Sequence, residues 1–426
     1  MSAPLRMSFV VHKLPPESLG GTEVYTRSLA RALAAQGHAV SIFAPSTTVQ
    51  QTESVPEADG VVVTRVPLPP TRATENPVAQ FWHTFRDGTL ESRFAHFIAQ
   101  TRPDVVHFQH VQGVSARLIA LAAGRPRFAT LHDYWYYCAN SQLVRPDRSP
   151  CAGPSAGCRN CVDCATARAD LAPLRALRPL VALPLAYRNQ TLRTAAAQID
   201  HFFAPSAFLR DRYAEQGFDG ARIQVLENGM DLQRLHAGGE AARPTTGGLR
   251  VGFLGTLAWQ KGPHVLVDAF NRLPPDTTAT LTLHGSGTAF PDYAATLRAT
   301  VRHPAITLAG PVPYNDVGRV MRSFDLLVVP SLWYENSPLV IQEAYALGIP
   351  VVASNLGALA EKVIDGQTGR LFAPGNSAAL AALLQEISAQ PAQISAWQRQ
   401  ITPPPSMEDH ALELAAIYRR HLAPPR

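Results

Sequence analysis

The 426-residue sequence predicts an α/β protein built on two parallel sheets. Short runs of β-branched and aromatic residues alternate with longer helical patterns, as expected of strands joined by crossover helices. The alternation occurs twice, on either side of a segment rich in glycine, alanine and polar residues. The length exceeds what one hydrophobic core usually covers, and 46% hydrophobic residues are enough for two cores.

The first half of the chain begins with a strand and a helix. The helix runs from Thr22 to Gln36 and is stopped by Gly37, a residue typical of helix C-termini. Six more strands follow before the glycine-rich segment. The seven expected strands are Ser8–His12, Val40–Ala44, Val61–Val66, Val105–Phe108, Phe128–Leu131, Phe202–Ala204 and Ile223–Leu226.

The second half repeats this pattern and then ends in a helix. Its strands are expected at Arg250–Leu254, Thr280–Leu283, Ile306–Leu308, Leu326–Val329 and Val351–Ala353. We therefore expect a first domain at 1–228, a linker at 229–248, a second domain at 249–405 and a final helical segment at 406–426. The helical pattern Met407–His421 follows prolines and is expected to pack on the surface or to cross back to the first domain.

Composition excludes several functional classes. The net charge of +5 is mild for this length and accompanies no aromatic-rich or basic recognition motif, so we expect no nucleic-acid partner. No apolar run approaches the roughly 18 residues needed to cross a bilayer, and Met7–Val11 is too short for the core of a signal peptide. The expected location is cytoplasmic, either free or peripheral at the inner face of the membrane.

Two carboxylates stand out in the apolar segment Ser331–Ser354. Ser337 and Pro338 are typical of a helix N-cap and first position, which places Glu335 in the preceding loop and Glu343 inside the helix. Glu343 then lies among apolar neighbours, where an unpaired carboxylate is unfavourable.

Two interpretations of Glu343 are open. It pairs with an arginine or caps a neighbouring loop, or it belongs to a ligand site. In the second case the N–H groups of Leu339 and Val340 bind anionic phosphate, and Glu343 accepts hydrogen bonds from sugar hydroxyls. Together these features describe a sugar-nucleotide site.

Each half has a candidate phosphate loop after its first strand. Gly20 and Gly21 precede the first helix, although a glycine pair there is more often a simple tight turn. In the second half, Thr256 and Lys261 lie between a strand and a helix that begins near Pro263. Lys261 is suited to neutralise a diphosphate, although an isolated lysine is more often only solvated.

Taken together, these residues resemble the retaining GT-B glycosyltransferases that use nucleotide-sugar donors, of the family 4 type. The resemblance spans nearly the whole chain. Its motifs are Gly20-Gly21-Thr22-Glu23, Gly37-His38, His132-Asp133, Pro205-Ser206, Asn228-Gly229-Met230-Asp231, Lys261-Gly262, Gly285-Ser286-Gly287, Glu335 with Glu343, and Gly357, Glu361, Gly366 and Gly369.

The resemblance implies a fold, a reaction and a set of site residues. It implies two Rossmann-like domains facing a central cleft, and a sugar transferred from a nucleoside diphosphate sugar to an acceptor hydroxyl with retention and without a metal. The acceptor would be a sugar or a lipid-linked glycan, in polysaccharide or glycolipid assembly. The implied donor site comprises Gly20, Gly21, Thr256, Lys261, Glu335, Asn336, Ser337, Pro338, Leu339, Val340 and Glu343.

Within that site the resemblance assigns individual roles. Glu343 would bind the ribose, Glu335 and the backbone after it would hold the donor sugar, and Lys261 would neutralise the diphosphate. His132 would lie beside the transferred sugar, the alternative being a histidine satisfied by backbone. Thr256 departs from the family pattern, because many members have arginine there and a hydroxyl supplies no charge.

All five cysteines fall between Cys138 and Cys164. Cys158, Cys161 and Cys164 form two overlapping C-x-x-C pairs, and Cys151 adds a fourth thiol with Cys138 as an alternative ligand, a pattern typical of a structural zinc site in an insertion at 138–164. An iron–sulfur cluster and unligated or redox-active thiols are the alternatives. We expect this loop to form part of the acceptor side.

The segment after the cysteines alternates arginines with leucines from Arg168 to Arg193. A basic amphipathic segment can lie on anionic lipid, and a lipid-linked acceptor would suit it. The alternative is helices packed on the domain with exposed arginines, because Pro173, Pro179 and Pro184 interrupt the run.

Two other functions are compatible with these patterns. A nucleotide-sugar epimerase would share the architecture but leave the cysteine loop without a purpose. A non-catalytic zinc-bearing scaffold would explain the absence of arginine at Thr256.

Overall fold

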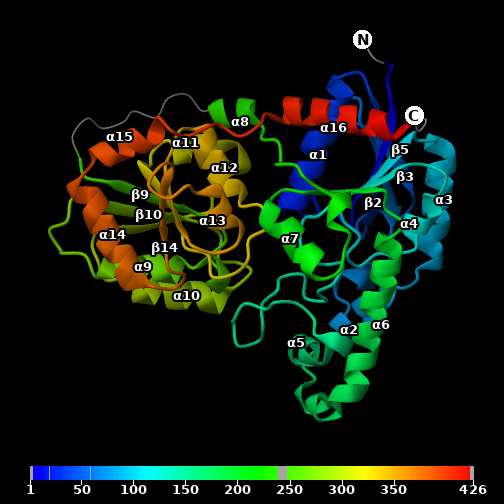
Figure 1. The fold of residues 1–426 in the computed structure, drawn as a ribbon, viewed down its shortest axis with the longest axis horizontal. Helices are drawn as coiled ribbons and strands as arrows, with labels where there is room; N and C mark the ends of the chain where they lie inside the picture. Colours follow the sequence, from blue (N-terminus) through cyan, green and yellow to red (C-terminus); the bar gives the residue numbers. More distant parts are fainter. Residues whose placement is uncertain (1–2, 19, 58, 238–246, 423–426) are drawn as a thin grey trace. The chain divides into compact units, whose positions relative to one another are not determined.

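The computed structural model describes residues 3–18, 20–57, 59–237 and 247–422. The chain forms two compact units, residues 1–229 with 407–426 and residues 230–406. Each unit contains one largely parallel sheet covered by helices, so the expected α/β class with two parallel sheets is confirmed (Figure 1). Residues 238–246 of the expected linker lie outside the described residues.

Unit 1 contains an eight-stranded sheet in which β3 alone is antiparallel to its neighbour. Its strands are stabilised by the burial of apolar side chains. In β1, for example, four of the five residues are buried. In spatial order the strands are β3 (Glu53–Pro56), β4 (Val62–Pro67), β2 (Ala39–Ser46), β1 (Arg6–Val10), β5 (Val105–Phe108), β6 (Arg127–Thr130), β7 (His201–Ala204) and β8 (Ile223–Val225).

The helices of unit 1 cover both faces of this sheet. A long segment between β6 and β7 contributes η2, α5, η3 and α6, which project from the unit (Figure 1). The helices are α1 (Gly21–Ala35), η1 (Pro70–Ala73), α2 (Pro77–His83), α3 (Gly88–Thr101), α4 (Leu118–Leu121), η2 (Ala156–Cys161), α5 (Val162–Arg168), η3 (Ala172–Leu177), α6 (Arg178–Ala196), α7 (Ala207–Glu215), η4 (Gly220–Arg222) and α16 (Met407–Leu422).

Helix α16 completes the core of unit 1 although it follows unit 2 in the sequence. Its apolar face packs against α1 in one buried cluster with residues of β1 and β2. Two buried hydrogen bonds fix its position. The Tyr25 hydroxyl lies 2.6 Å from His410 Nε2, and the Tyr418 hydroxyl lies 2.6 Å from His107 Nδ1.

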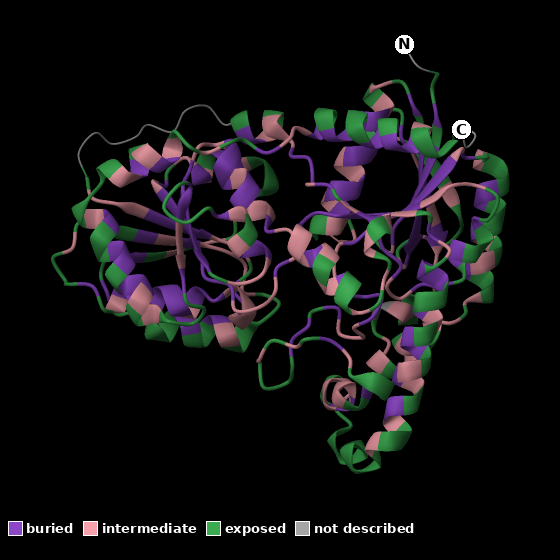
Figure 2. Ribbon diagram, viewed as in Figure 1, coloured by how far each residue is buried: buried purple, intermediate pink, exposed green. Residues whose placement is uncertain are grey.

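Unit 2 contains a six-stranded parallel sheet between two layers of helices. One buried cluster joins the sheet to α9, α10 and α14, and another joins it to α11, α12 and α13. Figure 2 shows its strands as largely buried. The strands, in spatial order, are β11 (Ile306–Gly310), β10 (Thr280–His284), β9 (Arg250–Leu254), β12 (Leu326–Val329), β13 (Val351–Ser354) and β14 (Gly369–Phe372).

The helices of unit 2 follow its strands closely. Of the described helices in either unit, none has both the length and the apolar composition needed to cross a bilayer. Those of unit 2 are α8 (Leu232–His236), η5 (Trp259–Lys261), α9 (Pro263–Asn271), α10 (Pro291–Thr300), η6 (Tyr314–Asp316), α11 (Val317–Met321), α12 (Leu339–Ala346), α13 (Ala358–Lys362), α14 (Ser377–Ala389) and α15 (Ala392–Gln398).

Candidate functional site

The donor-side candidates of unit 2 meet at a buried carboxylate, that of Glu335. Its Oε1 lies 2.8 Å from Lys261 Nζ and accepts hydrogen bonds from Ser331 Oγ (2.8 Å) and Trp333 Nε1 (2.9 Å). The Glu335 residue is 6% exposed, so burial is offset by three donors, one of them charged. An ammonium has three N–H donors, and Glu335 uses one of those of Lys261.

Lys261 and Glu335 converge because of the strands that they follow. Lys261 comes after β9 and Glu335 after β12, and these strands are parallel neighbours. Ligands of open parallel sheets bind at this carboxyl edge. Gly262 has a φ of +69°, and a Cβ there would lie 1.9 Å from the carbonyl oxygen of Pro330. The Lys-Gly pair is therefore required for the close approach of the two loops.

Glu343, the second carboxylate, has a partner that the sequence did not identify. Arg234 Nη2 lies 2.9 Å from Glu343 Oε1, with both side chains largely buried. The guanidinium also lies 3.9 Å from the centre of the Tyr314 ring and donates to the Tyr314 carbonyl oxygen (2.7 Å). Burial raises the pKa of Glu343, and the nearby Arg234 opposes that rise. The arginine-pairing interpretation of Glu343 thus has a named partner.

The expected start of the helix that contains Glu343 is wrong by one residue. Helix α12 begins at Leu339, and Pro338, which has no side-chain hydrogen bond to the helix, precedes it as the cap. Ser337 is therefore not the N-cap. The Leu339 N–H donates to the Ser337 carbonyl oxygen at 2.8 Å, so it is not free for phosphate as expected. A local turn satisfies this donor because proline at the cap offers no side-chain acceptor.

A cavity of about 390 Å³ opens at the same sheet edge, after β10 and β11. It is lined by the loop Gly285–Gly287 and by Gly310, Pro311 and Arg298. A Cβ on Gly285 would lie 1.9 Å from the Gly255 carbonyl oxygen, so these two loops touch through backbone. Thr256 is exposed beside them. The volume lies within the roughly 300–1,000 Å³ of small-ligand sites.

In unit 1, His132 follows β6 and contacts another side chain from a neighbouring loop. Its Nε2 lies 3.0 Å from Gln109 Oε1, and its ring packs edge-on against Tyr25, 5.3 Å between centres. Burial lowers the pKa of His132 to about 3, so the ring is neutral at physiological pH. Because an amide oxygen only accepts, Nε2 carries the proton and Nδ1 has the lone pair.

Asp133, the neighbour of His132 in the sequence, pairs with a different histidine. Its carboxylate lies 2.9 Å from His110 Nε2 and accepts from the Trp135 N–H at 2.8 Å. Gln109 and His110 come from the loop after β5, the neighbour of β6. The carboxyl edge of the unit 1 sheet therefore presents several polar groups.

The glycine pair lies at that edge as well. Gly20 is the N-cap of α1 and Gly21 its first residue. A Cβ on Gly20 would lie 2.5 Å from Glu23 Oε2, and Glu23 is itself buried and accepts from Ser18 Oγ at 2.9 Å. The glycine thus makes room for a buried carboxylate in the first turn of α1.

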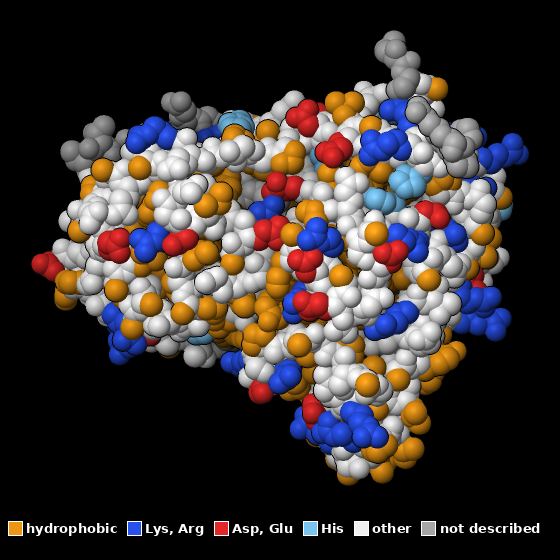
Figure 3. Space-filling view, in the orientation of Figure 1, with side chains coloured by type: hydrophobic (Ala, Val, Ile, Leu, Met, Phe, Trp, Pro, Cys, Tyr) orange, Lys and Arg blue, Asp and Glu red, His pale blue; other side chains and the backbone are white. Residues whose placement is uncertain are grey.

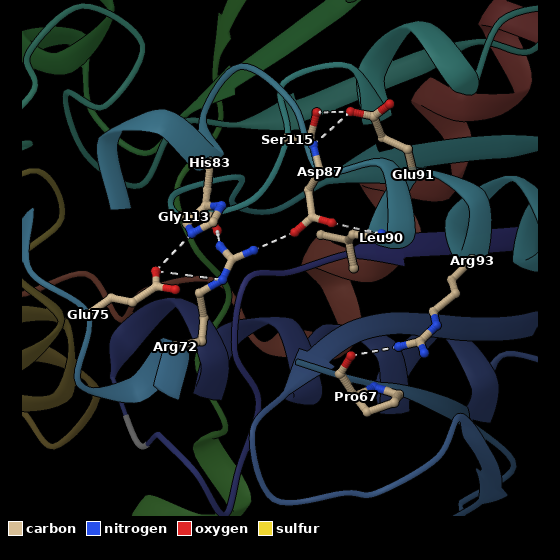
Figure 4. Close-up of polar contacts among 10 residues, drawn as sticks. All are labelled: Pro67, Arg72, Glu75, His83, Asp87, Leu90, Glu91, Arg93, Gly113 and Ser115. Carbon is tan, nitrogen blue, oxygen red and sulfur yellow. Dashed lines mark hydrogen bonds and ion pairs between the residues drawn. The ribbon is translucent and has the colours of Figure 1, made fainter. Parts of the chain in front are cut away.

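A polar pocket of about 560 Å³ after β2 and β4 was missed by sequence reasoning (Figure 4). Arg72 is central to it, because it pairs with Asp87 and donates to the Gly113 carbonyl oxygen at 3.3 Å. Glu75 accepts from His83, with Oε2 2.8 Å from Nε2. Arg72 and Asp87 lie 15 residues apart and Glu75 and His83 eight apart, but these charges follow no motif, so only the fold shows that they meet. Such a pocket suits a polyhydroxylated or phosphorylated ligand.

The structure does not support the expected zinc site. In the described ranges, no group of three or more His, Cys, Asp or Glu side chains is arranged to hold a metal ion. Cys158 is buried in an apolar cluster with α6, where Asn189 donates to its Sγ at 3.3 Å. Cys151 contacts the Gly153 backbone and Cys164 that of Val144. Cys158 and Cys161 interact with each other, whereas Cys151 and Cys164 contact backbone, and cysteine spacing does not reveal these contacts.

The predicted residues thus form two groups. Lys261, Glu335 and Glu343 lie in unit 2, while Gly20, Gly21 and His132 lie in unit 1. Residues that the sequence did not identify are Arg234, Gln109, His110 and the polar pocket around Arg72.

Comparisons with known proteins assign both units. Residues 19–234 match the sequence family described as Glycosyltransferase Family 4, and residues 248–390 match Glycosyl transferases group 1. A protein named glycogen synthase from Mycobacterium tuberculosis is 29% identical over 409 residues, 91% of this chain and 87% of that protein.

Solved structures share the fold over the whole chain. Sucrose-phosphate synthase from Thermosynechococcus elongatus has a TM-score of 0.71 at 19% identity, covering 97% of this chain and 98% of that one. Anabaena HepE in complex with UDP and glucose has a TM-score of 0.64 at 18% identity, covering 97% and 99%. At these identities the likeness concerns the fold, which is GT-B.

Proposed function

Because the chain belongs to glycosyltransferase family 4, we propose that it moves a hexosyl group from a nucleoside diphosphate sugar to an acceptor hydroxyl with retention at the anomeric carbon. The Lys261–Glu335 cluster carries this proposal. It places a cation and a buried carboxylate at the carboxyl edge of two adjacent parallel strands, where a donor binds in such sheets.

The donor occupies unit 2 in this proposal. The diphosphate lies against Lys261, which stabilises the charge that develops as the leaving group departs. The nucleoside lies along the cavity after β10 and β11, and Glu343 accepts from the ribose hydroxyls. Thr256 contributes a hydroxyl in place of an arginine, so Lys261 supplies most of the local positive charge. The UDP and glucose bound by HepE support a donor of this class.

The hydrogen bonds of Glu335 favour a mechanism without a protein nucleophile. Its Oε1 already accepts three hydrogen bonds, one from a charged ammonium, so this oxygen is engaged by protein donors. We infer that Glu335 positions Lys261 and the donor sugar, and that the departing phosphate takes the proton of the acceptor hydroxyl on the same face of the sugar. The close carboxylate pair of retaining glycosidases is not needed for this route.

The acceptor occupies unit 1 in this proposal. The neutral His132 lies at the carboxyl edge of the unit 1 sheet, beside the acceptor in this proposal, and the polar pocket around Arg72 offers charged donors for a glycan. We place the reaction in polysaccharide or glycolipid assembly on the cytoplasmic side of the membrane. No specific observation favours an epimerase or a scaffold.

Assays of donor hydrolysis and of sugar transfer test this assignment. Purified protein is incubated with UDP-, ADP- and GDP-sugars, and release of the nucleoside diphosphate is measured. We expect turnover with at least one donor and a loss of roughly a hundredfold or more in Lys261→Ala, because Lys261 acts on charge that develops in the transition state. Lys362→Ala, a lysine of the same unit outside the cluster, is the matched control. Unchanged turnover in Lys261→Ala would refute the donor site.

A further inference from the structure

The projecting segment of unit 1 encloses an apolar cavity of about 420 Å³. Helix α2 forms one wall, and α5, η3 and α6 form the others. Its rim is made of large apolar side chains that are 38–61% exposed, namely Val78, Trp82, Leu171, Leu174, Leu177 and Leu180. These exposed side chains form an apolar patch that is uncommon on the surface of a soluble protein. Such a patch marks an interaction site.

A fully buried arginine also lines the cavity. Arg188 donates from Nη2 to the Trp135 carbonyl oxygen (2.7 Å) and from Nη1 to Asn189 Oδ1 (2.9 Å), and it lies 4.0 Å over the Trp135 ring. Within the described residues it forms no ion pair, and its Nε has no hydrogen-bond partner. The carboxylate of Asp133 acts on Arg188 through space but does not pair with it directly, so an anionic ligand in contact with the guanidinium would stabilise this buried cation further.

Trp135, which lines the same cavity, has a second unsatisfied donor. Its indole Nε1 is buried and has no hydrogen-bond partner among the residues described. Arg188 and Trp135 thus both line an apolar cavity and both retain a buried N–H. Two such donors with one positive charge match an anionic oxygen group such as phosphate.

The surroundings of the cavity carry further positive charge. Arg168 lines it, and Arg175 and Arg178, both on the same projection, share the single carboxylate of Asp163. Figure 3 shows basic side chains, which on this projection are arginines, beside hydrophobic ones. An occupant that satisfies the whole site has a long apolar part and an anionic group.

We propose that this cavity binds a long-chain lipid phosphate, with the hydrocarbon chain against the leucines and the phosphate oxygens on Arg188 and Trp135. This inference rests on the proposed function and names its acceptor as a lipid-linked one. Gly113, which lines the cavity, accepts from Arg72 of the polar pocket, so the sites for chain and glycan adjoin. Trp135 lies three residues after His132, and its backbone N–H donates to Asp133 Oδ1.

Dodecyl phosphate is the probe for this site. Titration below its critical micelle concentration is followed by tryptophan fluorescence and by calorimetry, with dodecanol and inorganic phosphate in parallel. We expect saturable binding of dodecyl phosphate, at least tenfold weaker binding of dodecanol, and no binding of inorganic phosphate. Equal binding of dodecanol would overturn the proposal, because the arginine would then have no role.

Variants at the rim keep the test independent of folding. Leu177→Asp and Leu180→Asp alter exposed side chains and should weaken dodecyl phosphate binding at least tenfold, whereas Leu412→Asp, an equally exposed leucine on α16, should not. Arg188→Gln should abolish the preference for the phosphate over the alcohol. Unchanged binding in both rim variants would overturn the proposal even if Arg188→Gln failed to fold.

Two further measurements distinguish the lipid cavity from a bilayer contact elsewhere and from the proposed glycosyltransferase reaction. The first compares the binding of wild type and Leu177→Asp to vesicles of phosphatidylcholine and phosphatidylglycerol. Equal binding of the two proteins would indicate a bilayer contact elsewhere and overturn the cavity assignment. Donor hydrolysis on the same preparation tests the proposed function by itself. Hydrolysis without dodecyl phosphate binding rejects the lipid site alone, whereas binding without hydrolysis of any donor rejects the glycosyltransferase reaction alone.

Discussion

Single residues in this protein owe their roles to partners that lie far away in the sequence. Glu343 is the clearest example, because Arg234 reaches it from α8, 109 residues earlier. The sequence indicated that Glu343 needed a partner, yet no periodicity or motif pointed to Arg234. Lys261 and Glu335, in contrast, follow strands whose order can be inferred from a parallel α/β pattern, so their meeting was predictable.

A pair of variants separates the structural role of Glu343 from its proposed ligand role. Glu343→Leu leaves the buried Arg234 without its anion and should lower the free energy of unfolding by roughly 3–5 kcal/mol. Adding Arg234→Leu removes the unpaired charge and should restore most of that stability. Chemical denaturation measures both.

Nucleotide affinity in the same variants decides whether Glu343 contacts the donor. If it holds the ribose, the double variant should bind UDP or ADP at least tenfold more weakly than wild type although it is stable. A stable double variant with wild-type nucleotide affinity would show that Glu343 serves only as the counter-ion of Arg234.

At the scale of elements, most strands were predictable and the exceptions have physical causes. β3 (Glu53–Pro56) and β14 (Gly369–Phe372) were not expected, since both occupy sheet edges and neither shows a buried apolar run. The projection was predicted only in part. An alternating arginine–leucine pattern suggested exposed arginines and buried leucines, whereas Arg188 is buried and Leu180 exposed. The sequence pattern does not show which face of a helix interrupted by proline is buried.

Helix α16 is attached by histidines, which makes its attachment sensitive to acid. Burial lowers the pKa of His410 to about 4, and it lowers the pKa of His107 well below its usual value. Between pH 6.5 and 4 the unfolded chain binds protons that the folded chain does not, so the stability of unit 1 falls as pH falls. For His410 the loss should be on the order of 2–3 kcal/mol.

Urea unfolding at pH 7.5, 6 and 5 measures this dependence. His410→Gln can keep a hydrogen bond to Tyr25 but does not titrate, so it should flatten the slope between pH 7.5 and 5. His96→Gln, at an exposed histidine of α3, should leave the slope as in wild type. An unchanged slope in His410→Gln would contradict the prediction.

At the scale of the whole molecule, the two units have separate cores. The cluster that includes β1 and α16 takes its members from unit 1 alone, and the clusters around β9 and β12 take theirs from unit 2 alone. The donor-side residues also belong to unit 2. Hydrophobic burial that stays within one unit allows that unit to fold independently.

We therefore expect a fragment of residues 230–406 to fold and to bind the nucleoside diphosphate of the donor. Circular dichroism and calorimetry measure folding and affinity, with Lys261→Ala in the fragment as a weaker-binding comparison. Residues 1–229 alone should not fold stably, but joining 229 to 407–422 through a short glycine-serine linker should restore a cooperative transition. A disordered 230–406 fragment would contradict the independence of the two cores.

The position of α16 has a consequence for synthesis on the ribosome. Residues 1–229 emerge first, yet α1 cannot bury the surface that faces α16 until residues 407–422 have been made. At about 5–20 residues per second, translation of the intervening unit takes on the order of ten to thirty seconds. Unit 2, which is continuous in sequence, can finish folding before the unit that precedes it. During that interval the apolar face of α1 stays exposed to chaperones, and a ribosome that stalls after unit 2 leaves unit 2 folded and unit 1 incomplete.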